Sequence, residues 1–313
     1  MEILIQLGLL IVGFVLLMKG ADWFVDGAAG IAGKFGIPQL VIGLTIVAMG
    51  TSAPEAAVSI ASALKGSAAI TIGNVLGSNI MNILVILGIS AVLIPVAVQE
   101  STVKVEMPFM IAMTVLLLVL GMTDHKIGFF EGVILWVFFI GFMIYLFRMA
   151  RQSDGEEEAA ANKDKPIWLL ILLTIVGIIM IIKGSDVAVD AATAISRILG
   201  MSERFIALTV VALGTSLPEL FTSVTAARKG SADIAIGNIV GSNIFNILFV
   251  VGTTGLICPV TFAPEFLVDG IVAIAAAVLL WILVLKNRKL TRPGGALLLL
   301  FYAGYFAYLC LKM

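Results

Sequence analysis

Two stretches of the chain decide its fold, because each repeats the other. Residues 45–84 read TIVAMGTSAPEAAVSIASALKGSAAITIGNVLGSNIMNIL, and residues 209–248 read TVVALGTSLPELFTSVTAARKGSADIAIGNIVGSNIFNIL. They align without a gap at a spacing of 164 residues, and 25 of the 40 positions are identical. Such self-similarity is the signature of a repeated structural unit. We therefore divide the chain into a first half (1–148), a hydrophilic linker (149–165) and a second half (166–313).

The chain around these repeats is too apolar for a protein that folds in water. Of its 313 residues, 61% are hydrophobic and only 12% are charged, with a mean hydropathy of +1.15, whereas soluble domains carry about a quarter charged residues. The apolar residues form blocks of about 18 to 25, the length that crosses a hydrocarbon core as a helix. They do not alternate as the strands of a membrane barrel do. The sequence therefore predicts an all-α membrane protein.

Each half is predicted to contain five transmembrane helices, ten in all. The expected ranges are 3–26, 38–64, 68–94, 105–121, 128–149, 166–190, 202–228, 233–257, 265–286 and 294–312. An odd number per half gives the halves opposite orientations, the inverted repeat of secondary transporters. With the amino terminus outside, the inner loops hold 12 Lys and Arg against 5 on the outer side. The positive-inside rule therefore predicts both termini outside and the linker in the cytoplasm.

Helices 2 and 7 are predicted to be broken by proline. Residues 50–55 read GTSAPE and residues 214–219 read GTSLPE. Proline has no N–H, and its ring clashes with the carbonyl four residues earlier, so carbonyls near 48–51 and 212–215 are expected to lose their helical partners. Such backbone occurs at membrane depth only where it is buried or lines a cavity. Carbonyls beside a carboxylate suit a hard cation such as Ca²⁺.

Glu55 and Glu219 carry the strongest functional signal. An ionised side chain at the bilayer centre costs roughly 2.5–3.5 kcal/mol, and the repeats contain no cationic residue at a comparable depth. A structural role for an unpaired buried acid is therefore disfavoured. The neighbouring serines, threonines, prolines and glycines are individually as compatible with helix packing and interhelical hydrogen bonds as with ion binding.

The helix after each break adds polar groups on one face. Residues 73–82 and 237–246 share the pattern G-N-x-x-G-S-N-I-x-N. Ser78 and Asn82 are four residues apart, hence on the same helix face, and their mates are Ser242 and Asn246. Folded about a pseudo-two-fold axis, these groups would meet the glutamates at mid-membrane. Two carboxylates supply a charge of about −2, which one Ca²⁺ neutralises, and the same oxygens suit Na⁺.

Other polar residues are given a structural interpretation. Cys258 and Cys310 lack metal-ligand spacing, and His125 is expected at the surface. Four aspartates near the ends of the first and sixth helices are interpreted as interfacial charges, with Lys19 and Lys183 as partners within one turn. They are Asp22, Asp26, Asp186 and Asp190. No cofactor, nucleic acid or protein partner is indicated, so the expected partners are Ca²⁺, Na⁺ and membrane lipid.

The paired motifs resemble the cation/Ca²⁺ exchanger superfamily, specifically its prokaryotic Na⁺/Ca²⁺ exchanger-like branch. The resemblance covers essentially the whole chain, and the two motifs together are highly specific. It implies Na⁺/Ca²⁺ antiport by alternating access in a prokaryotic cell membrane, with the first and sixth helices sliding against a rigid core. The family expectation is three Na⁺ for one Ca²⁺.

The resemblance also implies a set of ion ligands. The ligands expected for Ca²⁺, with the glutamates shared by Na⁺, are Glu55, Glu219, Thr51 and Thr215. Those expected for Na⁺ are Ala48, Ser52, Ser78, Ala212, Ser216 and Ser242. The residues expected to line the site are Asn82 and Asn246, where some family members have Asp at the second position. Here both are Asn, so the site has one fewer potential negative charge.

Three alternatives follow from the same residues. A Ca²⁺/H⁺ antiporter remains open, because a membrane glutamate can itself carry a proton. A channel would use similar oxygens without a counter-ion, but broken helices in inverted repeats favour a transporter. An enzyme is disfavoured, because G-T-S is not a nucleophile elbow and the sequence has one histidine, outside the repeats.

Overall fold

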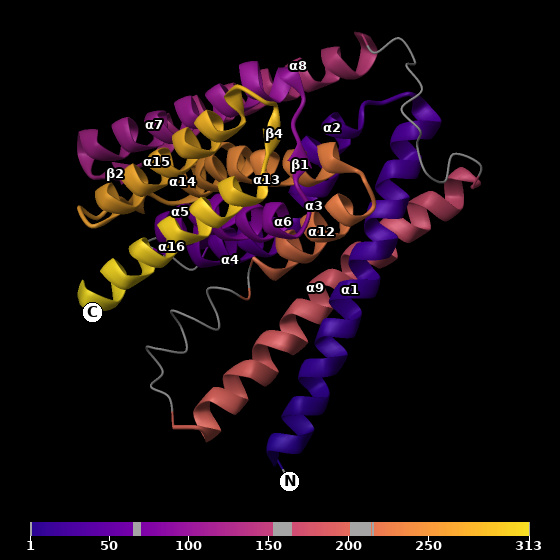
Figure 1. The fold of residues 1–313 in the computed structure, drawn as a ribbon. Helices are drawn as coiled ribbons and strands as arrows, with labels where there is room; N and C mark the ends of the chain where they lie inside the picture. The colour runs from indigo at the N-terminus through magenta and orange to yellow at the C-terminus, as the bar shows by residue number, and fades with distance from the viewer. Residues whose placement is uncertain (1, 65–69, 153–164, 201–213, 215, 313) are drawn as a thin grey trace.

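The computed structural model describes residues 2–64, 70–152, 165–200, 214 and 216–312, and in these ranges the protein is mostly helical (Figure 1). Eight of the described helices are long and apolar enough to cross a membrane. One further pair, Gln39–Thr51 and Ala53–Ala61, passes the same test and is bent by 46° at its break. The predicted helix over 202–228 is described only in part: residues 202–213 and 215 lie outside the described residues, and the remainder forms a helix over Leu217–Arg228.

Apart from the first, the helices of the first half follow their predicted ranges closely. Its elements are α1 (Glu2–Phe35), α2 (Gln39–Ile42), η1 (Gly43–Val47), α3 (Ala48–Thr51), α4 (Ala53–Leu64), α5 (Ile70–Met81), η2 (Asn82–Ile86), α6 (Leu87–Leu93), β1 (Val96–Ala97), η3 (Thr102–Glu106), α7 (Met107–Asp124), β2 (Lys126–Ile127) and α8 (Phe129–Gln152). The elements labelled η are single π-helical turns within longer helices. Such turns often occur at functional sites.

The second half repeats this order in its described part. Its elements are α9 (Ile167–Ile198), α12 (Leu217–Arg228), α13 (Ala232–Phe245), η5 (Asn246–Val251), α14 (Gly252–Ile257), β3 (Val260–Thr261), α15 (Phe266–Leu285), β4 (Lys289–Leu290) and α16 (Arg292–Lys312). The π-turns η2 and η5 both begin at the asparagine that ends the repeated motif. The local backbone therefore recurs at the spacing of the sequence repeat.

Helices α1 and α9 lie side by side and extend away from the other helices (Figure 1). They run antiparallel, because Gly13 meets Gly184 while Gly20 meets Gly177. A Cβ added at Gly20 would lie 2.9 Å from the carbonyl oxygen of Gly177 and from the amide nitrogen of Ile181. Glycines seven residues apart on each helix thus allow direct contact between the two backbones.

Both of these helices are longer than predicted. The expected ranges ended at 26 and 190, whereas α1 continues to Phe35 and α9 to Ile198. The additional turns of α1 continue its contact with α9, because a Cβ added at Gly27 or Gly30 would meet Leu170. The ends are set by Gly36 and Gly200, which have φ of +63° and +78°, the left-handed geometry of a helix stop.

The centre of the bundle is formed by α13, whose residues from Ile234 to Phe245 are all buried. Two short antiparallel ribbons tie the halves together at the helix ends: β1 pairs with β4, and β2 pairs with β3. Each ribbon joins one strand from each half. The two halves are therefore interleaved and share one core.

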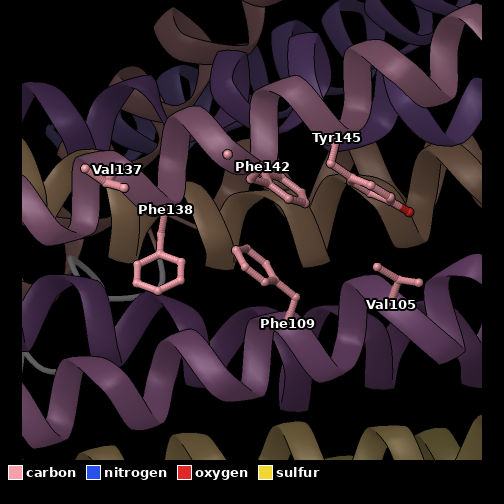
Figure 2. Close-up of a pocket in the computed structure, with 7 residues that line it drawn as sticks. Val105, Phe109, Val137, Phe138, Phe142 and Tyr145 are labelled. Carbon is pink, nitrogen blue, oxygen red and sulfur yellow. The ribbon is translucent and has the colours of Figure 1, made fainter.

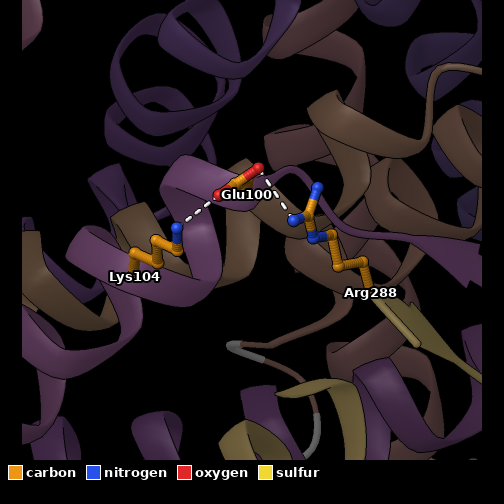
Figure 3. Close-up of polar contacts among 3 residues, drawn as sticks. All are labelled: Glu100, Lys104 and Arg288. Atoms are coloured by element: carbon orange, nitrogen blue, oxygen red, sulfur yellow. Dashed lines mark hydrogen bonds and ion pairs between the residues drawn. The ribbon is translucent and has the colours of Figure 1, made fainter. Parts of the chain in front are cut away.

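A surface ion-pair cluster supports one of these ribbons (Figure 3). Glu100 bonds Lys104 on the same turn, and its other oxygen lies 2.8 Å from the guanidinium of Arg288, just before β4. The Lys104 hydrogen bond, followed by the charge of Arg288, holds the pKa of the Glu100 carboxyl below its usual value. Because this pKa is lowered on folding, the stabilisation is present at neutral pH and is lost as the pH falls through it.

The interfacial aspartates of α1 have a different partner from the one predicted. Asp22 and Asp26 contact Lys229, at 3.5 and 2.8 Å, instead of pairing with Lys19. Lys229 follows α12, so this contact joins the end of a second-half helix to α1. In the second half, Lys183 does contact Asp186 at 3.2 Å. All of these groups are partly exposed, consistent with interfacial charges.

Candidate ion-binding site

The first helix break lies at Ser52. Helix α3 ends at Thr51, Ser52 leaves helical geometry with φ −83° and ψ 7°, and α4 begins at Ala53. Pro54 is the second residue of α4, where its missing N–H costs no helical hydrogen bond. Thr51, Ser52 and Glu55 are all fully buried. The bend therefore places a hydroxyl pair and a carboxylate inside the protein.

The second break repeats this geometry as far as the chain is described. Ser216 precedes α12 with φ −91° and ψ 2°, and Pro218 and Glu219 follow in the first turn. Glu219 is fully buried and Ser216 is 2% exposed. Two predicted ligands, Ala212 and Thr215, lie outside the described residues.

Hydrogen bonds between the halves join the two breaks. The hydroxyl of Ser52 donates to Oε1 of Glu219 at 2.9 Å. Thr51 donates to Oδ1 of Asn238 at 3.0 Å. A first-half serine is thus bonded directly to the second-half acid, and the breaks adjoin one another in the core.

The predicted serines on the following helices reach the same region. Ser78 lies 3.5 Å from Oε1 of Glu55, and Ser242 donates to the carbonyl of Ala48 at 3.3 Å. That carbonyl also accepts the N–H of Ser52 at 3.0 Å. The expectation that the Ala48 carbonyl would lose its helical partner is therefore wrong, because the helix continues to Thr51 and the N–H of Ser52 still completes its last turn.

Five oxygen atoms in this region are buried and have no hydrogen-bond partner among the described residues. They are Oε2 of Glu55, Oε2 of Glu219, Oγ of Ser216, Oδ1 of Asn82 and Oδ1 of Asn246. An unpaired buried polar atom is costly, and five of them come from the repeated motifs. Oxygen atoms of this kind are the ligands that hard cations prefer.

Neither glutamate is neutralised by a cationic side chain in the described part of the chain. The ion pairs found there all lie at partly exposed positions outside the breaks. Ser52, which lies three residues before Glu55, donates directly to Glu219, so the two acids are brought together in the core. Two like charges close together in a buried space require a cation or a proton to stabilise them.

Sequence reasoning did not assign Asn74 and Asn238, which support the glutamate backbones. Asn74 donates to the carbonyl of Glu55 at 3.4 Å and to Ser59 at 3.2 Å. Asn238 makes the equivalent contacts to Glu219 and Ser223, at 3.5 and 2.9 Å. Both asparagines occupy the same position in the two copies of the repeated motif. That recurrence was the one feature of the sequence that could have pointed to them.

Four further amides join α5 and the following turn η2 to α13 and the following turn η5. Asn79 and Asn243 each donate to the other's backbone carbonyl, at 3.1 and 3.2 Å. Asn82 donates to Oδ1 of Asn243 at 3.0 Å, and Asn246 donates to Oδ1 of Asn79 at 3.1 Å. We call these four side chains the amide bridge. Asn82 and Asn246 were predicted to line the site, whereas Asn79 and Asn243 were not assigned a role.

A pocket of about 340 Å³ between α7 and α8 is separate from this region (Figure 2). Its lining contains none of the predicted ligands and is almost entirely apolar: Val105, Phe109, Val137, Phe138, Gly141, Phe142 and Tyr145. Nearby, Tyr145 donates to the buried carboxyl of Glu106. The sequence did not single out Glu106, because its tyrosine partner lies on another helix.

Comparison with known proteins gives the class of protein to which this site belongs. The sodium/calcium exchanger protein family matches residues 5–148 and 169–311, so the chain belongs to that family of membrane transporters. This confirms the resemblance inferred from the motifs.

Relatives match along nearly their whole length. The putative antiporter CaxA of Alkalimonas amylolytica is 41% identical, over 94% of this chain and 95% of that protein. The sodium/calcium exchanger MaX1 of Methanosarcina acetivorans is 32% identical, over 96% and 97%. The solved sodium-calcium exchanger NCX_Mj, soaked with Na⁺ and Sr²⁺, superposes with a TM-score of 0.85 at 31% identity, over 97% and 99%.

Proposed function

We propose that this protein is an antiporter that exchanges Na⁺ for Ca²⁺ across a prokaryotic cell membrane by alternating access. The observation that carries the proposal is the pair of buried carboxylates, Glu55 and Glu219, each with an oxygen that has no protein partner. The family supports it, as do the sodium/calcium exchangers MaX1 and NCX_Mj among its relatives. Transport requires no bond-making chemistry, and no cofactor enters the proposal.

The proposed ion site follows the predicted ligands. Ca²⁺ would be held by Glu55 and Glu219 with the carbonyls of Thr51 and Thr215. Na⁺ would use the same glutamates and the flanking groups Ala48, Ser52, Ser78, Ala212, Ser216 and Ser242, with Asn82 and Asn246 lining the centre. The contacts of Ser52 with Glu219, and of Ser78 with Glu55, support this assignment. Two carboxylates neutralise one Ca²⁺, and several Na⁺ ions can replace it on the same oxygens.

We further propose ten membrane helices in two inverted halves, 1–148 and 166–313, joined by a cytoplasmic linker over 149–165. Hydrogen bonds that recur at a spacing of 164 residues support the repeat, and the antiparallel packing of the equivalent helices α1 and α9 supports the inversion. The bend at Ser52 supports a proline break in helix 2, and we propose an equivalent break in helix 7. The distribution of basic residues favours both termini outside.

Glycine contacts between α1 and α9 suit the proposed movement. Their backbones meet directly through glycines, so the two helices can move together as one unit. Asp22 and Asp26 hold α1 to Lys229 through exposed ion pairs, which contribute little each and break readily. Sliding of this helix pair against the remaining bundle would expose the ions alternately to the two sides.

A Ca²⁺/H⁺ antiporter is the second candidate. Among the relatives, CaxA is described only as a putative antiporter, which leaves the counter-ion open. Buried carboxyls accept protons as well as cations, and Asn82 and Asn246 add no charge to the site. The two candidates share the site and differ in the ion that displaces Ca²⁺.

Competition between the ions tests the proposed site in the purified protein. We expect Ca²⁺ to bind to detergent-solubilised protein with a stoichiometry of one, measured by calorimetry at constant ionic strength. Replacing choline by Na⁺ should weaken this binding progressively, because both ions use the two glutamates. Ca²⁺ binding that is indifferent to Na⁺ but weakens on acidification would instead support the proton-coupled candidate.

A further inference from the structure

The orientation of the amide bridge is fixed by its two backbone contacts. Nδ2 of Asn79 lies 3.1 Å from the carbonyl oxygen of Asn243, and Nδ2 of Asn243 lies 3.2 Å from that of Asn79. A backbone carbonyl only accepts hydrogen bonds, so the amide nitrogen must face it in each case. Both side chains are buried, at 2% and 1% exposure, so a flipped amide would leave two oxygens facing one another without water.

This orientation determines that of the next pair. Because the nitrogens of Asn79 and Asn243 are engaged, their Oδ1 atoms accept from Asn246 and Asn82, at 3.1 and 3.0 Å. The nitrogens of Asn82 and Asn246 are therefore also engaged. Their Oδ1 atoms point away from these contacts and are buried without a partner.

We propose that Asn79 and Asn243 are positioning residues that present the amide oxygens of Asn82 and Asn246 to the transported ion. The inference rests on the proposed function and adds two residues to it. An amide oxygen is a good ligand for Na⁺ or Ca²⁺, whereas an amide nitrogen in its place repels the ion. Groups that orient a ligand in this way commonly matter almost as much as the ligand.

The bridge acts across the repeat. Asn79 belongs to the first half but orients Asn246 of the second, and Asn243 orients Asn82 of the first. The π-turns η2 and η5 begin at the two oriented residues. This crossed arrangement distinguishes a positioning role from a general contribution to packing between α5 and α13.

A set of double variants tests the crossed arrangement through Na⁺-driven Ca²⁺ uptake in proteoliposomes. Asn79→Leu preserves the side-chain shape but removes both hydrogen bonds. We expect it to raise the KM for Ca²⁺ about tenfold or more, the range of such supporting groups. The same increase should appear in an Asn82→Ala background. In an Asn246→Ala background it should fall to within about twofold, because the residue that Asn79 orients is absent.

Controls separate positioning from folding. Thr254→Val removes a buried hydroxyl whose one hydrogen bond among the described residues is to the carbonyl of Val250, one turn earlier, and should leave the KM unchanged. If Asn79→Leu does not fold, Asn79→Ala and the mirror variant Asn243→Leu, with the two backgrounds exchanged, replace it. An equal effect of Asn79→Leu in both backgrounds, or no effect in the wild type, would overturn the inference.

Calorimetric Ca²⁺ binding by the same purified variants keeps the two proposals distinguishable. A wild type that binds Ca²⁺ but shows no Na⁺-driven uptake contradicts the proposed function. The effect of Asn79→Leu in the two backgrounds is then measured as a change in the Kd for Ca²⁺. A wild type that binds no Ca²⁺ contradicts both. A wild type that transports normally while the pattern is absent contradicts the positioning role alone.

Discussion

Replacing Glu55 by Gln is expected to abolish Na⁺-dependent Ca²⁺ uptake in reconstituted vesicles. Gln preserves the size of the side chain but removes one of the two negative charges assigned to the Ca²⁺ site. Glu55 is fully buried, so solvent water cannot stabilise the bound ion in place of the missing carboxylate. We expect the Ca²⁺ affinity to fall at least about 100-fold, equivalent to about 2.8 kcal/mol.

The matched control is Glu131→Gln, at the start of α8. Glu131 accepts a hydrogen bond from the N–H of Gly128, a contact that the amide oxygen of Gln can also make. Its uptake should match that of the wild type. Glu219→Gln should reproduce the loss seen at Glu55, since the acids are equivalent. Robust uptake by either site variant would exclude the paired-carboxylate site.

Gly20→Leu is expected to separate α1 from α9. A Cβ at Gly20 already meets the backbone of Gly177 and Ile181 at 2.9 Å, and backbone cannot move aside as a flexible side chain does. Overpacking of this kind typically costs 1–3 kcal/mol, and a larger side chain against backbone lies at or above the upper end. We expect a marked fall in melting temperature and loss of transport.

Gly8→Leu is the matched control on the same helix. A Cβ at Gly8 meets nothing within 4 Å among the described residues, so the same substitution should leave melting and transport near wild type. Equal tolerance of both variants, measured by thermal unfolding in detergent, would contradict the close packing of α1 and α9.

Much of the fold was predictable because each membrane helix can be recognised from its own contiguous residues. Membrane helices are apolar blocks of limited length, and the described helices lie close to their predicted ranges. A break before Glu55 was expected from Pro54, and the helix does bend at Ser52. The family was predictable from two motifs that occur twice. The predicted ends of α1 and α9 were too early. The small and polar residues of their last turns are equally compatible with a loop at the membrane interface, and the sequence does not show which helix they pack against.

The contacts between the halves were not predictable. The pairing of Asp22 and Asp26 with Lys229 joins residues about 200 positions apart, whereas the prediction considered only the nearest lysine. The amide bridge depends equally on how α5 and α13 face one another. Asn74 and Asn238 were visible in the motif, but their support of the glutamates became clear only from the fold.

The central claim is that Na⁺ drives the transport of Ca²⁺, and one flux measurement tests it most directly. Vesicles containing the purified protein are loaded either with Na⁺ at equal pH on both sides, or with acidic Na⁺-free buffer. Ca²⁺ uptake is then followed after dilution into Na⁺-free medium at neutral pH. We predict uptake only into the Na⁺-loaded vesicles. Equal uptake driven by the pH gradient without Na⁺ would contradict the account and assign the proton as the counter-ion.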